Sequence, residues 1–143
     1  LNDENKAHDN RWTHRPRFDW VKAELRHQSG TIEHQIFNAI KKMIAVRKEI
    51  PAFADFYNRE LIHIENPHLF VFSRSDLSHA TGGVLVVANF DANPQYLDMK
   101  HSNVKSVLSY GQVKDLISGD VPTMFKDQLV IPPYHFYWLS DKQ

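Results

Sequence analysis

The sequence has no cysteine, only five glycines and no long apolar run. The lack of cysteine excludes disulfides, thiol nucleophiles and thiolate metal sites, and it is neutral about the compartment. The glycines are scattered, which argues against a glycine-rich phosphate-binding loop between a strand and a helix. No apolar run approaches the roughly 20 residues that a membrane-spanning helix needs. We therefore expect no cofactor and no membrane partner.

Charge of neither sign is in excess. Lysine and arginine total 17, aspartate and glutamate also total 17, and the formal net charge is zero. Because nucleic acids attract basic surfaces, we expect no nucleic-acid partner. With 143 residues, 42% of them hydrophobic, the chain can form one domain with a core, or a small domain and a piece of another. The residues Leu1–Asn5 lack the pattern of a signal peptide. The localisation is left unassigned, with a slight preference for the cytoplasm.

Catalytic and metal-binding patterns are also missing. The nine histidines include no pair at the i, i+4 spacing that places two ligands on one helix face, so we expect no metal site. No serine lies in a Gly-x-Ser-x-Gly sequence. Glycoside chemistry uses a pair of carboxylates, and nothing in the sequence singles out two of the acidic residues. We therefore assign no catalytic residue in this chain.

Residues 31–49 carry the clearest secondary-structure signal. Ser29 or Thr31 can cap the start of a helix, and Pro51 takes Ile50 out of helical geometry and ends it. The sequence therefore predicts a long helix over residues 31–49, with a wide apolar face whose partner is not evident in this chain. The apolar residues of this face are Ile32, Ile36, Phe37, Ile40, Met43 and Ile44.

After Pro51 the pattern changes to short runs of β-branched and aromatic residues, separated by turn residues. Such runs predict an antiparallel β-sandwich. The predicted fold class is therefore mostly β with one long helix, and the change in composition near Pro51 divides the chain into residues 1–56 and residues 57–143. The predicted strands are residues 61–65, 69–74, 84–90, 95–98, 104–110, 114–117, 128–131 and 136–139.

The segment Asp9–Arg17 has an unusual composition. It combines three arginines, a histidine and a tryptophan within nine positions, and Pro16 restricts its backbone. Arginine offers a planar donor fork to carboxylates, and tryptophan offers a flat apolar face to a sugar ring or a guanidinium. Local chemistry alone allows a recognition segment or a basic surface loop with one anchoring aromatic residue, and it favours the surface loop.

The same segment, Asp9-Asn10-Arg11-Trp12-Thr13-His14-Arg15-Pro16-Arg17, resembles the Asp-x-Arg-Trp-x-His-Arg-Pro-Arg stretch of the amylosucrases. These are glucose-transferring members of the alpha-amylase family of glycoside hydrolases. The resemblance covers about residues 9–139, and the part downstream of the segment is shared widely within the family. Its further motifs are Met43-Ile44-Ala45-Val46-Arg47, Pro51-Ala52-Phe53, Val87-Ala88-Asn89-Phe90, Pro94-Gln95, Leu129-Val130-Ile131-Pro132-Pro133-Tyr134-His135 and Trp138-Leu139.

The resemblance implies a parent enzyme with a (β/α)8 barrel and a C-terminal β-sandwich. A complete barrel needs at least about 200 residues, so residues 1–56 would be the end of the barrel, including its last helix at about 31–49. Residues 57–143 would be the C-terminal domain. The catalytic carboxylates of the family lie earlier in the chain, so the isolated chain is predicted to be inactive. Its partners would be the rest of the barrel and, in the parent, sucrose or an α-glucan.

Arg11 is the functional residue that the resemblance carries over. It matches the family arginine that pairs with an aspartate at the floor of the glucose-binding pocket, which makes it a substrate-binding residue, and such a pairing suits the bidentate geometry of arginine. Thr13 and the longer loop over residues 75–83 depart from the amylosucrase pattern. These departures leave open a sucrose hydrolase or another transglucosidase.

The main alternative is a non-catalytic sugar-binding or scaffolding domain. Exposed aromatic residues on one face of the sandwich would favour it, the candidates being Tyr96, Tyr110, Phe136 and Tyr137, although most of these are expected in the core. The apolar face of the helix over residues 31–49 would also allow self-association.

Overall fold

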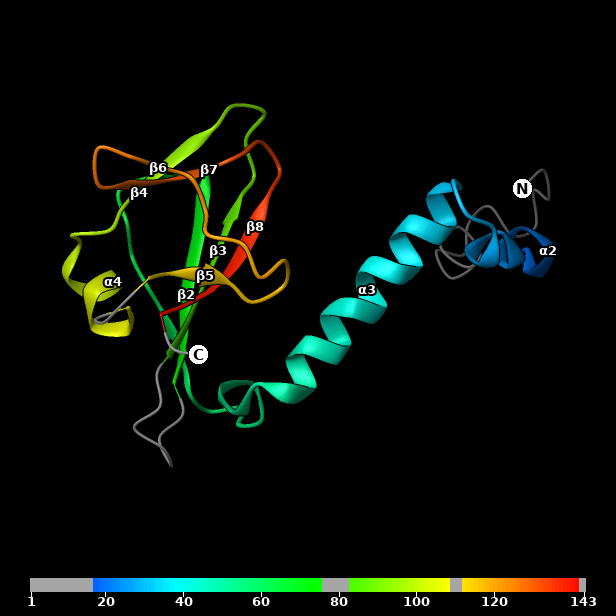
Figure 1. The fold of residues 1–143 in the computed structure, drawn as a ribbon, viewed down its shortest axis with the longest axis horizontal. Coiled ribbons are helices and arrows are strands. Elements are labelled where there is room, and N and C mark those ends of the chain that lie inside the picture. Colours follow the sequence, from blue (N-terminus) through cyan, green and yellow to red (C-terminus); the bar gives the residue numbers. More distant parts are fainter. Residues whose placement is uncertain (1–16, 76–82, 109–111, 142–143) are drawn as a thin grey trace, which may run out of the picture. The chain divides into compact units, whose positions relative to one another are not determined.

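The computed structural model describes residues 17–75, 83–108 and 112–141 of the chain (Figure 1). The chain divides into two compact units, Leu1–Lys41 and Lys42–Gln143, and each is described by itself. The division into domains of residues 1–56 and 57–143 stays a prediction.

The described part of the first unit is helical. Helix α2 (Trp20–Ala23) continues into the 3-10 helix η1 (Glu24–His27). Helix α3 (Ile32–Glu49) follows, and its residues from Lys42 onward belong to the second unit. Thr31 caps α3, because its hydroxyl oxygen accepts a hydrogen bond from the backbone nitrogen of His34 at 3.1 Å. The capping and the apolar spacing explain why the long predicted helix is present at nearly the predicted bounds.

Helix α3 exposes its apolar residues. No residue of α3 is buried, and Ile36 and Ile40 keep 55% and 48% of their surface exposed. An apolar face of this kind normally packs against another element. Among the described residues, no helix is long and apolar enough to cross a membrane. The residues Ile32, Ile36, Phe37, Ile40 and Ile44 together form the α3 face.

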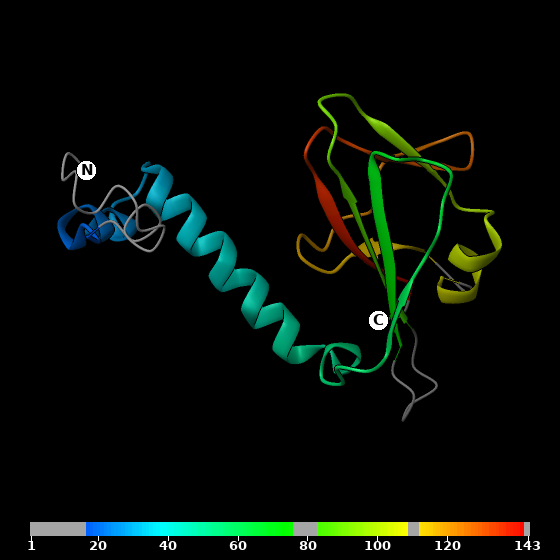
Figure 2. The same cartoon turned by 180° about the vertical axis from the view of Figure 1, so that it is seen from behind.

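The second unit contains two antiparallel sheets. One sheet has five strands in the order β1-β2-β3-β8-β5, and the other has three in the order β4-β7-β6. In both Figure 1 and Figure 2 the three-stranded sheet lies at one end of the long strands β2, β3 and β8. The strands are β1 (Arg59–Leu61), β2 (Leu69–Ser75), β3 (Gly83–Asn89), β4 (Gln95–Asp98), β5 (Lys114–Asp115), β6 (Met124–Phe125), β7 (Gln128–Ile131) and β8 (Phe136–Ser140).

Strand β3 is buried on both of its faces, which explains its almost wholly apolar sequence. Leu85 and Val87 face the main core, which also contains Leu97, Leu129 and Ile131 from the three-stranded sheet. The intervening residues face the opposite side, where a smaller core forms with the 3-10 helix η2 (Pro51–Phe53). This smaller core contains Ala52, Phe53, Val84 and Val86.

The predicted strand over residues 104–110 is wrong where the structure describes it. Helix α4 (Ser102–Val107) occupies this region, and residues 109 and 110 lie outside the described part. Val104 and Leu108 are four positions apart and both join the main core, as the spacing of a helix requires. The β-branched valines favoured a strand in the sequence, and the burial of this helical face overrides that preference.

The strands at two edges also differ from the prediction. Strand β1 covers residues 59–61 rather than 61–65, and Ile62 beyond its end is buried and donates its backbone N–H to the carbonyl of Val71 at 3.0 Å. Strand β6 was not predicted. It pairs with β7 through a two-residue turn, Lys126 and Asp127, whose φ angles of 49° and 65° are typical of a type I′ hairpin.

Candidate functional site

Arg11, the predicted substrate-binding residue, lies outside the described residues, as does the whole segment over residues 9–16. Tyr110 is outside them as well. Two candidate sites lie in the second unit, and neither was predicted from the sequence, although Tyr96 of the first was named as a candidate for sugar contact.

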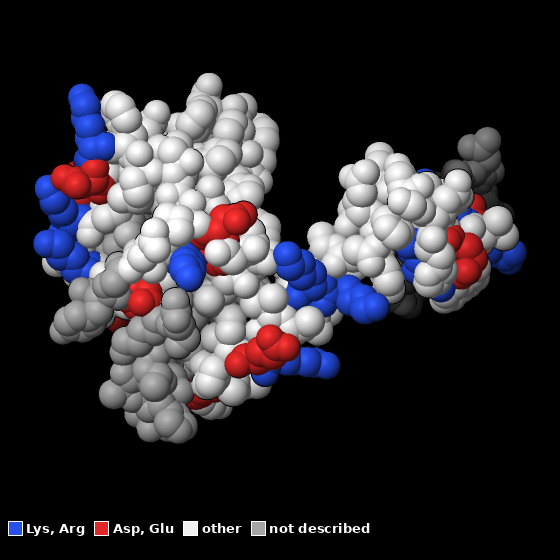
Figure 3. All heavy atoms as spheres, viewed as in Figure 1, with Lys and Arg blue, Asp and Glu red and all other residues white. Residues whose placement is uncertain are grey.

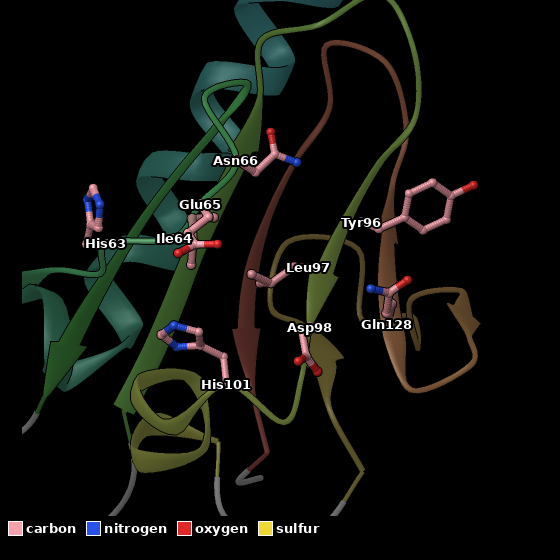
Figure 4. A pocket seen from close by; sticks show the side chains of 9 residues that line it. All are labelled: His63, Ile64, Glu65, Asn66, Tyr96, Leu97, Asp98, His101 and Gln128. Carbon is pink, nitrogen blue, oxygen red and sulfur yellow. The ribbon is translucent and has the colours of Figure 1, made fainter.

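A pocket of about 430 Å³ lies at the edge of strand β4. It is lined by residues 63–66 after β1, by residues 96–98 of β4, by His101 before α4 and by Gln128 of β7 (Figure 4). Clefts of roughly 300–1,000 Å³ are the usual size of small-molecule sites. Turn residues place these segments together: Asn66-Pro67 ends the first and Pro94-Gln95 begins the second.

Strand pairing puts three of the lining side chains on one face. Asp98 lies opposite Gln128 across the β4–β7 ladder, and Tyr96 is two residues along the same strand. Tyr96 keeps 46% of its surface exposed, and its ring centre lies 6.5 Å from that of Phe125, with the planes tilted by 56°. That face thus carries a carboxylate, an amide and an exposed aromatic ring, and the ring of Tyr96 points away from Glu65 (Figure 4).

Hydrogen bonds fix the rim of this pocket. The side-chain amide of Asn66 donates to Oε1 of Gln95 at 2.9 Å, which ties the loop to β4. Oδ1 of Asp98 accepts the backbone N–H of Lys100 at 2.8 Å, which orients the carboxylate. Across the described residues, no hydrogen bond or ion pair engages the side chains of Glu65 and Gln128. These two groups are free to bind a ligand.

The pocket lining carries carboxylates but no strong cation. Glu65, Asp98 and two histidines line it, and no lysine or arginine of the described ranges does. The nearby Lys100 is engaged elsewhere, because its ammonium lies 2.7 Å from Oδ2 of Asp127. This bond raises the pKa of Lys100 and lowers that of Asp127. In the view of Figure 3 charges of both signs are interspersed and most of the surface is uncharged.

Metal binding finds no support in the part of the chain that the structure describes. There, no group of three or more histidine, aspartate or glutamate side chains is placed to hold an ion. His101 has a buried Nδ1 atom with no hydrogen-bond partner among the described residues. The pocket therefore offers groups for hydrogen bonding rather than a coordination site.

A second polar cluster lies where η2 meets the five-stranded sheet. Arg74 is buried, its guanidinium lies 5.6 Å from the ring centre of Phe53, and it donates a hydrogen bond to the carbonyl of Asp55. Burial lowers the pKa of Arg74, the charges of Arg59 and Arg47 lower it further, and Asp55 acts in the opposite direction. This cluster fastens the segment after α3 to the sheet, and we assign it a structural role.

The outer face of the five-stranded sheet is only partly covered. Cross-strand pairing places Phe70, Ala88 and Phe136 side by side on the face that also carries Val86. Phe53 covers Val86 within the smaller core, whereas Phe70 and Phe136 remain 47% and 37% exposed. The apolar surface of the second unit thus extends beyond η2. Most of the candidate aromatic residues for sugar binding were expected in the core. Of those that the structure describes, Tyr96 and Phe136 are exposed and Tyr137 is partly buried.

The fold is similar to part of one solved hydrolase. No model of a protein family matches the chain. The trehalose-6-phosphate hydrolase of Bacillus licheniformis matches with a TM-score of 0.54 and 20% sequence identity, over 72% of this chain and 18% of that enzyme. Trehalulose synthase MutB matches over 69% of this chain and 17% of its own, with 21% identity, but its TM-score of 0.47 is too low to indicate a shared fold.

The chain therefore spans about a fifth of the length of the hydrolase that it matches. The predicted antiparallel β fold of the C-terminal part is confirmed: the structure is mostly antiparallel β with few helices, and its fold is similar to part of that hydrolase. The assignment of residues 1–56 to the end of a barrel stays a prediction. At 20% identity the likeness extends to the fold and not to a substrate.

Proposed function

We propose that this chain is the C-terminal part of a carbohydrate-active enzyme of the alpha-amylase family. The parent would be a retaining transglucosidase that acts on sucrose or an α-glucoside. The similarity of the fold to 18% of a trehalose-6-phosphate hydrolase supports the general class. The resemblance of the segment Asp9–Arg17 to the amylosucrases supports the more specific activity.

The observation that carries the proposal is the uncovered α3 face. A helix in a protein gains most of its stability from packing its apolar face against other elements, yet α3 has no buried residue. In the proposed parent, α3 is the last helix of the barrel, and the rest of that barrel covers the α3 face.

The proposed chemistry needs residues from this chain and from the rest of the barrel. Retaining enzymes form a covalent glycosyl intermediate on one carboxylate while a second carboxylate acts first as acid and then as base. In this proposal both belong to the barrel. Arg11 would pair with a barrel aspartate at the floor of the glucose pocket, where a bidentate contact fixes the geometry of both side chains.

The test is an assay of the full-length protein that carries this chain. We expect it to release fructose from sucrose in excess of free glucose, because a transglucosidase passes glucose to a sugar acceptor. The 143-residue chain alone should release no fructose. Trehalose 6-phosphate is the comparison substrate, and cleavage of that compound but not of sucrose would move the parent to a different specificity. Fructose release by the isolated chain would refute the proposal that the catalytic carboxylates lie outside this chain.

A non-catalytic sugar-binding or scaffolding domain is the second candidate. The exposed ring of Tyr96 beside the pocket favours sugar binding. The tilt of 56° between Tyr96 and Phe125 means that these rings do not form a flat two-ring platform. The two candidates are compatible, because a domain attached to a glycosidase can bind sugar at a site of its own.

A further inference from the structure

We infer that the pocket beside β4 binds a short neutral oligosaccharide through Tyr96, Asp98 and Gln128, with Glu65 as a further hydrogen-bonding group of its lining. This inference does not rest on the proposed activity of the parent, because it uses only the second unit. It deepens the second candidate function, sugar binding, by assigning it to named residues of the second unit.

The charge of the lining selects the class of ligand. Glu65 and Asp98 are present, and within the described ranges no lysine or arginine lines the pocket. An anion such as a phosphate would therefore meet carboxylates without a balancing cation. A neutral polyol meets no such penalty, since its hydroxyl groups can donate hydrogen bonds to carboxylate oxygens.

The polar side chains match the hydrogen-bonding pattern of a sugar. A hydroxyl group is both donor and acceptor, and the pocket supplies acceptors from carboxylates as well as the donor and acceptor of the Gln128 amide. Glu65 and Gln128 carry no hydrogen bond or ion pair within the described part of the chain. Asp98 is oriented by the backbone N–H of Lys100, which occupies only its Oδ1 atom. A ligand therefore binds without breaking existing contacts.

The exposed aromatic ring supplies the apolar part of the site. A pyranose presents C–H groups on its faces, and these pack against the face of an aromatic ring while the hydroxyl groups point outward. Tyr96 lies on the same sheet face as Asp98 and Gln128 and keeps 46% of its surface exposed. Its contact with Phe125 limits the movement of the ring, which reduces the entropy lost on binding.

The experiment is a titration of the isotopically labelled 143-residue chain with maltoheptaose, followed by NMR. We expect saturable shifts of the backbone amides of residues 64–66, 96–98 and 128, with a Kd near or below about 1 mM. Cellohexaose tests whether the linkage between the rings is recognised, and inorganic phosphate and Ca²⁺ are the charged comparison ligands. Shifts of the same amides with phosphate or Ca²⁺, and with neither sugar, would overturn the inference.

Variants separate the ring from the rest of the pocket. Tyr96→Ala should raise the Kd about tenfold or more, whereas Tyr96→Phe, which keeps the ring, should stay within about threefold of the original. Tyr57→Ala is the matched control, because Tyr57 is an exposed tyrosine that does not line the pocket. Circular dichroism verifies that each variant is folded. Equal loss of binding in Tyr96→Ala and Tyr57→Ala, or no saturable shift with either sugar, contradicts the site.

Discussion

The guanidinium of Arg74 lies over the ring of Phe53, 5.6 Å from its centre, in a buried position between η2 and the five-stranded sheet. One of its nitrogens donates to the carbonyl of Asp55, while its buried Nε atom has no partner among the described residues. Arg74 therefore combines a favourable ring contact and a hydrogen bond with an uncompensated donor. Its contribution to stability is the difference between these effects.

We expect Arg74→Ala to lower the free energy of unfolding by about 2–3 kcal/mol, because it opens a cavity and removes a charged hydrogen bond. Arg74→Met keeps much of the apolar volume and removes the unpaired donor, so its loss should be under about 1 kcal/mol. Urea denaturation of both variants measures the two losses. Equal losses would mean that the charge, rather than packing, dominates.

Asn89 holds three chain segments together. Its buried side-chain nitrogen lies 2.9, 3.1 and 2.9 Å from the carbonyl oxygens of Asn93, Ile131 and Pro132, and its Oδ1 accepts the backbone N–H of Asp91. Asn89→Asp replaces the donor by an acceptor among carbonyl oxygens. We expect a loss of about 2–3 kcal/mol, measurable as a lower Tm. An unchanged Tm would show that the turn holds without this side chain.

The turn after β3 should also make the protein sensitive to acid. Hydrogen bonds from the backbone and then the side chain of Asn93 lower the pKa of Asp91, and His68 lowers it further. Because the folded-state pKa of Asp91 lies below the unfolded value of about 3.9, its contribution is present above that pH and is lost as the pH falls through the folded value.

The check compares the wild-type residue with Asp91→Asn, both in a His68→Gln background that removes the ion pair with Asp91. The difference in free energy of unfolding should be constant above about pH 5 and should shrink below about pH 4. A difference that grows as the pH falls would have the wrong sign for a lowered pKa.

Gly83 at the start of β3 is required by the close approach of α4. A Cβ atom at this position would lie 2.7 Å from Cγ1 of Val107 and 3.2 Å from the carbonyl oxygen of Arg74. We expect Gly83→Ala to cost about 1–3 kcal/mol through overpacking. Val107→Ala in the same chain should recover part of that cost, and a double-mutant cycle in urea measures the coupling. Additive effects would mean that the backbone contact, not Val107, sets the cost.

Arg11 is testable in the full-length enzyme that we propose. Arg11→Ala should reduce turnover of sucrose strongly, because it leaves the barrel aspartate unpaired at the floor of the glucose pocket. The loss of a buried ion pair also costs about 3–5 kcal/mol of stability, so the Tm of the full-length enzyme should fall as well. Arg59→Ala is the control, since Arg59 is exposed and lies outside the segment Asp9–Arg17. In the isolated 143-residue chain Arg11→Ala should be silent in thermal unfolding. A comparable loss of Tm in both contexts would make Arg11 a local structural residue.

The elements with a clear local signal could be predicted from the sequence. The apolar spacing and Pro51 define α3, and the apolar run from Val84 gives β3, because periodicity and turn residues report directly on the backbone. Strand β6 could not be predicted, since Met124 and Phe125 are exposed and form a strand only by pairing with β7.

The candidate pocket could not be predicted, because its lining depends on pairing between distant segments. Asp98 and Gln128 are neighbours only through the register of β4 and β7. Residues 63–66 line the same pocket because Asn66 is bonded to Gln95. Tyr96 was named as a candidate for sugar contact from its residue type alone, and its partners in the pocket required the tertiary structure.

The edges of the five-stranded sheet bear on how the purified chain behaves at high concentration. Strand β1 has three residues and β5 has two, and both carry charged side chains. Short, charged edges offer few unpaired backbone groups to another chain, so fibril growth by strand addition is disfavoured there. Aggregation should instead begin through side chains of the α3 face. Mild detergent should therefore reduce this aggregation. The aggregates should be amorphous and should redissolve, rather than form ordered fibres.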